Sequence, residues 1–264
     1  MTDRSRLDWM TRYQQRLLPI ATVVVIVAIW EIVGRVAHWN PLFFAYPSQI
    51  WSGAVELAHG PLWSDLRVSG TEFLLGMVLS VLIAVPVGLV LGTSRRLYWA
   101  FDPIVGALYS TPVLVLAPLL VIWFGLGIAS KVAIVVILST FPVMINLTEG
   151  VRTTDRVLLR AARSFGASRW NLYRDVVLPS VTPFFITGLR LAVGRAMIGV
   201  IVGEYIASTE GIGYQINADA ELFATPRYLA GVMVIVVFSV AVMELLKILE
   251  KRMAPWRHQL LARE

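Results

Sequence analysis

Three charged residues stand inside a long apolar stretch of this sequence, residues 182–207. They are Arg190, Arg195 and Glu204. Charged side chains in a segment of this composition are rare, and they pair with one another or face a polar pathway. The five donors of a guanidinium suit a carboxylate, a sulfonate or another oxyanion. These residues therefore suggest recognition of an anion, with Arg195 as a transient counter-charge.

Each of these residues also has a structural interpretation. Arg190 is near one end of the stretch, so its side chain could reach the lipid headgroups of a membrane and anchor that end of the helix. Glu204 either pairs locally or lines an outer vestibule. Arg195 lies about 20 Å into a helix that begins near Thr182, and it either faces a pathway or pairs with another helix. It is not expected to pair with Glu204, because nine residues at about 100° each put the two on opposite faces.

The sequence offers little for other kinds of chemistry. It has no cysteine, which excludes disulfides, thiolate chemistry and cysteine-based zinc sites. Its three histidines are far apart and form no ligand motif, so we expect no metal site. It has no G-x-x-x-x-G-K-[ST] loop for ATP. We also find no catalytic Ser/His/Asp, paired-carboxylate or metal set at membrane depth, so we expect neither an enzyme nor a cofactor in this chain.

The composition places these residues in a membrane. Hydrophobic residues make up 57% of the chain and charged residues 15%, whereas a soluble domain is about 25% charged. A spanning helix needs about 20 mostly apolar residues. The sequence therefore predicts an all-α membrane protein with a single transmembrane domain over residues 1–264. Its six spanning helices are expected at about 17–36, 73–92, 101–124, 129–147, 182–207 and 226–246.

Prolines fall inside several of the expected spans. They are Pro86, Pro112, Pro118 and Pro142. Membrane bundles tolerate such prolines because neighbouring groups bond to the freed carbonyls. Nearby polar residues are expected to do this in preference to lining a pathway; they are Tyr109, Ser110, Thr111, Asn146 and Thr148. A row of small residues, Ala192, Ala196, Gly199 and Gly203, predicts close helix packing within the bundle or across a dimer interface.

The positive charges decide the orientation. With the N-terminus in the cytoplasm, 17 Lys and Arg residues fall on the cytoplasmic side and four on the other. Cytoplasmic loops carry such an excess. Both chain ends are therefore expected in the cytoplasm of a bacterial cell, with the chain in the inner membrane. The asymmetry also accounts for the net charge of +6 without a nucleic-acid partner.

One cytoplasmic loop, residues 150–179, differs from the others. Its first half is a good helix former from Arg156, and Gly166 is expected to end that helix. Ser168 is a plausible N-cap for a second helix, which presents Trp170, Tyr173 and Val177 on one face. Pro179 is expected to follow the end of that helix.

Two other interpretations of this loop are open. Two helices joined at a glycine also describe a DNA-binding helix-turn-helix, but both ends here are tied to spans. An amphipathic helix resting on headgroups would explain the arginines. It would not explain the small step at Ala161 and Ala162 before Gly166, which would let the surface of another protein approach closely.

The motif Ala161-Ala162-x-x-x-Gly166, with Leu178-Pro179 beyond it, resembles the EAA loop of ABC importer permeases. In that family the loop is a cytoplasmic coupling helix that docks into the ATPase subunit. The resemblance implies a docking role for Arg160, Ala161, Ala162, Gly166, Ala167, Ser168 and Pro179. Arg160 stands where the motif has Glu, so a contact that needs a carboxylate there is missing.

The resemblance covers roughly residues 41–256 and is closest to the nitrate/sulfonate/taurine branch. Segments that carry it are 46–48, 116–127, 161–168 and 188–194, with Glu204 and Gly211-Ile212-Gly213. It implies a type I importer fold and a homodimer. It also implies two cytoplasmic ATPase subunits, which hold ATP and Mg, and an extracytoplasmic solute-binding protein.

The functional prediction is thus a permease subunit that moves a small, anionic solute, driven by ATP hydrolysis on a separate subunit. The alternative is an ion-coupled secondary transporter. Such folds often show inverted repeats; we find none, and this alternative leaves the 150–179 loop unexplained. The sequence does not reveal which solute is moved.

Overall fold

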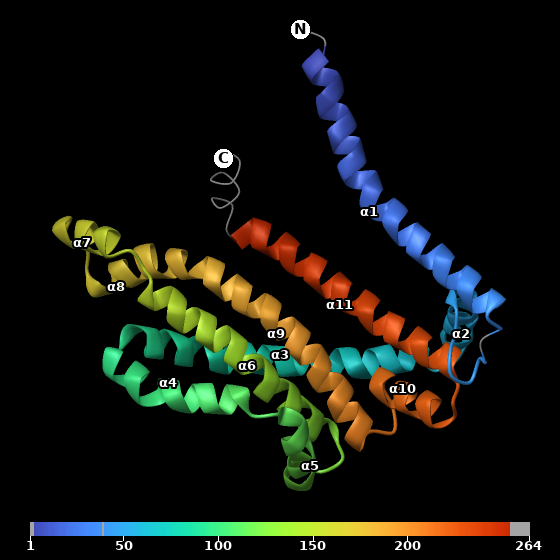
Figure 1. Ribbon diagram of the computed structural model, residues 1–264. Helices are drawn as coiled ribbons and strands as arrows, with labels where there is room; N and C mark the ends of the chain where they lie inside the picture. The colour runs from blue at the N-terminus through green and yellow to red at the C-terminus, as the bar shows by residue number, and fades with distance from the viewer. Residues whose placement is uncertain (1–2, 39, 254–264) are drawn as a thin grey trace. The chain divides into compact units, whose positions relative to one another are not determined.

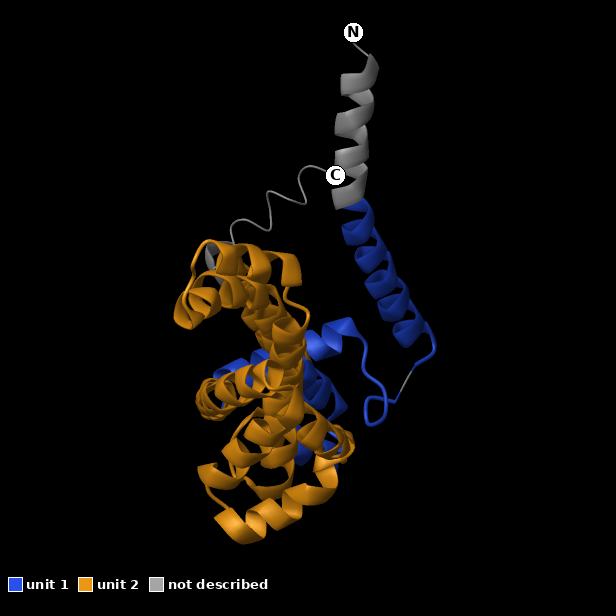
Figure 2. Cartoon of the chain, turned by 90° about the vertical axis from the view of Figure 1, so that its left-hand side faces the viewer, with its two compact units in different colours: residues 1–62, 216–232 blue, residues 63–215, 233–264 orange. Residues whose placement is uncertain are grey.

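The computed structural model describes residues 3–38 and 40–253. Residues 1–2, 39 and 254–264 lie outside the described residues, and with them the two chain ends that the charge pattern assigns to the cytoplasm. Over its described part the chain forms helices and no strand. It divides into two compact units (Figure 2), residues 1–62 with 216–232 and residues 63–215 with 233–264.

The first unit contains α1 (Asp3–Val36), α2 (Pro47–His59), most of α10 (Ile212–Glu221) and the start of α11 (Thr225–Met253). Ion pairs of Arg227 in α11 connect this helix to α2 and to α10. The guanidinium lies 3.3 Å from Asp219 and 3.3 Å from Glu56. The ring of Phe43 meets that of Phe223 edge-on. The expected first span, 17–36, is the second half of α1.

The second unit carries the functional residues of the sequence analysis. Figure 1 shows α6 running between α3 and α9, with the short α7 and α8 at one end of these helices. Its elements are α3 (Leu62–Thr93), α4 (Arg95–Ser110), α5 (Val113–Phe124), α6 (Ile128–Arg152), α7 (Arg156–Ser164), α8 (Arg169–Leu172), the π-helical turn η1 (Tyr173–Val177) and α9 (Leu178–Ala207), followed by the rest of α11.

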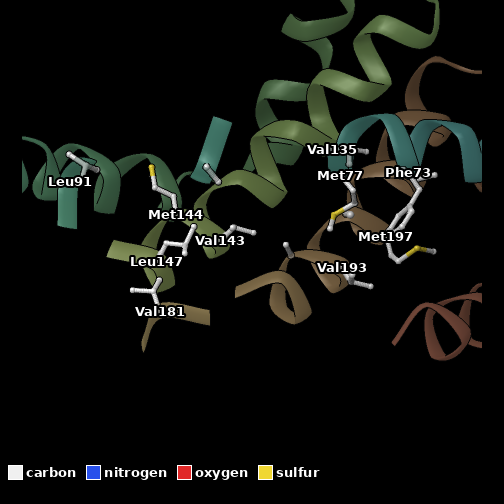
Figure 3. Packing of buried hydrophobic residues seen from close by; sticks show 14 residues of the cluster. Phe73, Met77, Leu91, Val135, Val143, Met144, Leu147, Val181, Val193 and Met197 are labelled. Atoms are coloured by element: carbon white, nitrogen blue, oxygen red, sulfur yellow. The ribbon is translucent and has the colours of Figure 1, made fainter. Parts of the chain in front are cut away.

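Small residues bring α6 close to both of its neighbours. A Cβ added at Gly199 of α9 would lie 3.0 Å from Cα of Val135, and one at Gly88 of α3 would lie 2.9 Å from the carbonyl oxygen of Met144. The predicted row of small residues on α9 therefore packs within the bundle. Buried apolar side chains of the three helices fill the rest of this core (Figure 3), among them Phe73, Met77, Leu91, Val135, Val143, Met144, Leu147, Val193 and Met197.

Five of the six expected spans correspond to single helices that are long and apolar enough to cross a membrane. The third, 101–124, does not. It belongs to two helices, α4 and α5, which meet at an angle of 92°. Pro112 has no N–H and keeps Thr111 out of the helical region, at φ −70° and ψ 128°. Pro86, Pro118 and Pro142 stay inside helices as expected.

Candidate functional site

Arg195 lines a cavity of about 340 Å³ beside the break between α4 and α5. Its guanidinium donates to the hydroxyl of Tyr109 over 3.4 Å and lies 5.4 Å from the centre of that ring. Among the described residues no carboxylate forms an ion pair with it. Its donors are therefore mostly unused, which is what recognition of an oxyanion requires.

Polar side chains near the break donate to carbonyls one turn earlier in their own helices. The hydroxyl of Ser110 donates to the carbonyl of Gly106, and that of Thr111 donates to the carbonyl of Ala107. The amide of Asn146 likewise donates to the carbonyl of Pro142 at 2.8 Å. These acceptors are each four residues earlier in the same helix, and they differ from the carbonyls of Leu108 and Leu138, which Pro112 and Pro142 free. The predicted bonds to freed carbonyls are therefore not among them. The hydroxyl of Tyr109 instead accepts from Arg195.

Glu204 is fully buried and pairs locally. The hydroxyl of Ser69 in α3 donates to one carboxylate oxygen at 2.6 Å, and the backbone N–H of Gly213 donates to the other at 2.5 Å. Of the two interpretations left open by the sequence, the structure supports the local pairing. As predicted, Glu204 does not contact Arg195.

Glu204 is one of three side chains that accept hydrogen bonds from the backbone of the turn after α9. Three successive backbone N–H groups, of Gly211, Ile212 and Gly213, donate to Asp65, Ser69 and Glu204 respectively. Gly211 has φ +110°, and a Cβ there would collide with the carboxylate of Glu204. The turn is thus fastened to α3 and α9 at the start of α10.

A buried ion pair adjoins this turn and was not expected from the sequence. Lys131 of α6 lies 2.8 Å from Glu72 of α3, and its ammonium donates to the hydroxyl of Ser208 at 2.8 Å. Both charged side chains are at most 7% exposed. The available signal was two opposite charges, each at the edge of an expected span.

Arg190 forms an ion pair within the same unit. Its guanidinium lies 2.8 Å from the carboxylate of Glu250 in α11. Arg190 is absent from the residues that line the cavity of Arg195. This geometry favours the anchoring interpretation over a place in a pathway.

The loop between α6 and α9 begins as the sequence predicts. Asp155 caps α7 by accepting from the N–H of Val157. The helix ends with Gly166 at φ +80°, where Gly166 donates to the carbonyl of Arg163 and Ala167 to that of Ala162. Ser168 then caps α8 by accepting from the N–H of Asn171.

The end of the loop differs from the prediction. Pro179 does not terminate the second helix; it lies in the first turn of α9, and Arg169–Ala207 forms one span candidate. The chain passes from α8 into α9 through the π turn η1, in which the N–H of Leu178 donates to the carbonyl of Tyr173. The predicted shared face is not uniform, because Trp170 is 67% exposed while Tyr173 and Val177 are partly buried.

The outward surface of α7 suits contact with another protein. Val157, Leu158 and the following Phe165 are all exposed, and Phe165 is 91% exposed. Ala161 lies between them on the same face. For metal binding, the described residues contain no suitable group of three His, Cys, Asp or Glu side chains.

Comparison with known proteins identifies the family. Residues 80–255 match the model of the binding-protein-dependent transport system inner membrane component. The taurine transport system permease protein TauC of Escherichia coli is 33% identical, covering 95% of this chain and 94% of TauC. The formylaminopyrimidine transport permease protein ThiX of Halalkalibacterium halodurans is 32% identical over 94% and 99% of the two chains. A putative aliphatic sulfonates transport permease protein of Bacillus subtilis is 30% identical over 97% and 90%. The chain is therefore a multi-pass inner-membrane protein that belongs to the permease family of binding-protein-dependent ABC importers.

Proposed function

We propose that this permease moves a small oxyanion, such as a sulfonate or a carboxylate, and that Arg195 is its counter-charge during passage. The observation that carries the proposal is an unpaired guanidinium, deep in an apolar helix, on the wall of a 340 Å³ cavity. An arginine facing lipid at this depth would be penalised by at least about 2.5–3.5 kcal/mol. A wet cavity avoids that penalty, and a passing anion would use the free donors.

The family does not decide the substrate class. Two of the relatives are named for taurine and aliphatic sulfonates, which carry a sulfonate group, and a third is named for formylaminopyrimidine. The argument for an oxyanion therefore rests on Arg195 and its surroundings in this chain.

The proposed assembly contains two copies of this chain, two cytoplasmic ATPase subunits that bind ATP and Mg, and an extracytoplasmic solute-binding protein. The loop of α7 and α8 would dock into the ATPase, and both chain ends would lie in the cytoplasm. Because the chain has no cysteine, a single cysteine placed at Ser168 tests the orientation. Its labelling by an impermeant reagent from outside intact cells would contradict it.

The transport proposal is tested with the complete complex in proteoliposomes. ATP-driven uptake is measured with the solute that the binding protein retains, and competition is compared between sulfonates or carboxylates and their neutral isosteres. We expect competition from the oxyanions alone. Equal competition by the neutral isosteres would exclude an anionic substrate. Uptake by this chain alone, driven by an ion gradient, would favour the secondary transporter.

A further inference from the structure

A second cavity, of about 800 Å³, is separate from the cavity of Arg195. It lies among the ends of several helices, beside the coupling loop of residues 150–179. The residues that line it come from the end of α3, the start of α4, the end of α6, the loop helices α7 and α8, and η1. Five arginines line it, namely Arg95, Arg152, Arg156, Arg163 and Arg169. No aspartate or glutamate is among the lining residues.

These arginines lack the partners that would neutralise them. Among the described residues, no carboxylate forms an ion pair with any of the five. Two of them are held by aromatic rings instead: Arg152 lies 3.5 Å from the ring centre of Tyr98, and Arg95 lies 4.4 Å from that of Trp99. Stacking fixes a guanidinium in place and leaves its N–H donors free. The pocket is therefore ordered in advance for an anion with several acceptor oxygens.

We infer that this pocket binds a phosphate group, carried by an anionic phospholipid of the cytoplasmic leaflet. The inference uses the orientation proposed above. Phosphate offers the oxygens that several arginines can share. Basic pockets between spanning helices on the cytoplasmic side suit such head groups. Trp99, which is 59% exposed beside Arg95, suits the headgroup level of a membrane.

The two faces of α7 separate this site from ATPase docking. Arg156, Leu159 and Arg163 are spaced i, i+3 and i+7 and line the pocket. The exposed Val157, Leu158 and Ala161 lie on the opposite face, which is the one left for another protein. A bound phosphate would therefore tie the inner face of the coupling helix to the ends of α4 and α6 without occupying the docking face.

The test compares two charge-matched double variants in the complete complex with its ATPases. The pocket variant is Arg95→Gln with Arg152→Gln. The control is Arg96→Gln with Arg174→Gln, two exposed arginines outside the pocket. Each complex is placed in phosphatidylcholine nanodiscs with increasing phosphatidylglycerol, and the phosphatidylglycerol retained after extraction is measured by native mass spectrometry. We expect roughly 30-fold weaker retention by the pocket variant, about fivefold per arginine.

A second arm distinguishes the source of the phosphate. Inorganic phosphate is titrated into each complex in pure phosphatidylcholine discs, with thermal stability as the readout. Pocket-dependent lipid retention assigns the site to lipid, and pocket-dependent stabilisation by inorganic phosphate alone assigns it to soluble phosphate. Equal behaviour of both variants in both arms overturns the inference. Loss of ATPase subunits from the pocket variant alone also overturns it, because the arginines would then contact the ATPase. Neither readout requires transport, so a failure here is separate from a failure of the proposed substrate.

Discussion

Two charges on the same helix have opposite surroundings. Glu204 is fully buried, and the hydroxyl of Ser69 and the N–H of Gly213 occupy its two oxygens. Arg195, nine residues earlier, is exposed to a cavity and has one long hydrogen bond, 3.4 Å, to Tyr109. The sequence alone left both a pairing role and a place in the pathway open for each of them.

The contrast shows how to separate a structural charge from a functional one inside a membrane helix. A buried charge persists when its partners are complete, and removing one partner is costly because the other is left unpaired. Glu204 meets this description. A charge with unused donors on a cavity wall is available to a ligand, as Arg195 is.

The largest expected effect comes from Glu204→Ala. The change leaves the hydroxyl of Ser69 and the N–H of Gly213 without their acceptor, and we expect a loss of about 1–3 kcal/mol of stability for each stranded donor. Glu204→Gln, which keeps one acceptor oxygen, should lose less. Thermal unfolding and protease sensitivity of the purified chain measure both. If Glu204→Ala unfolds like the wild type but fails to transport, then Glu204 belongs to the pathway and the contrast with Arg195 disappears.

The effect of Arg195→Ala should be confined to transport. Loss of a charge-assisted hydrogen bond to the solute corresponds to roughly 10- to 100-fold slower uptake. Arg195→Lys keeps the charge without the planar fork and should be intermediate. Assembly and basal ATPase activity are the controls, and both should match the wild type. Normal uptake by both variants, or failure through lost assembly, would contradict the counter-charge role.

Gly166→Val tests the coupling loop, in which Gly166 lies between α7 and α8. Gly166 has φ +80° and open space around its Cβ position, so the cost is backbone strain alone, about 1–3 kcal/mol. We expect the variant to insert normally, with uptake lost and ATPase binding weakened or unproductive. Gly166→Asn is the matched control, because asparagine tolerates this conformation. Normal uptake by Gly166→Val would show that the loop does not couple.

The smallest effect is expected for Arg190→Ala. Its ion pair with Glu250 is partly exposed, at 47% for the Arg190 side chain, so its contribution is about 0–1 kcal/mol. Uptake should change less than twofold, in contrast to Arg195→Ala. A large loss of uptake in a stable, assembled Arg190→Ala complex would give Arg190 a place in the pathway after all.

The sequence predicted the parts of the fold that depend on local composition. The spans follow from apolar length, and the helix break at Gly166 follows from the preference of glycine for positive φ. The break at Pro112 was missed because Pro86, Pro118 and Pro142 are tolerated inside helices, and local sequence does not separate the two outcomes. The partners of Glu204 and Lys131 were missed because Ser69 and Glu72 lie far away in the chain.

The π turn at Tyr173–Val177 lies in the helix that joins the loop to α9. It holds one residue more than a regular turn. In an unbroken α-helix an extra residue would rotate the segment beyond it by about 100° and shift that segment by about 1.5 Å along the axis. The π turn takes up the extra residue locally, so the helical segments on its two sides keep nearly the phase of an uninterrupted helix. A change of one residue in length at this place would therefore leave the direction of the loop helices, and the positions of Arg195 and Glu204, nearly unchanged.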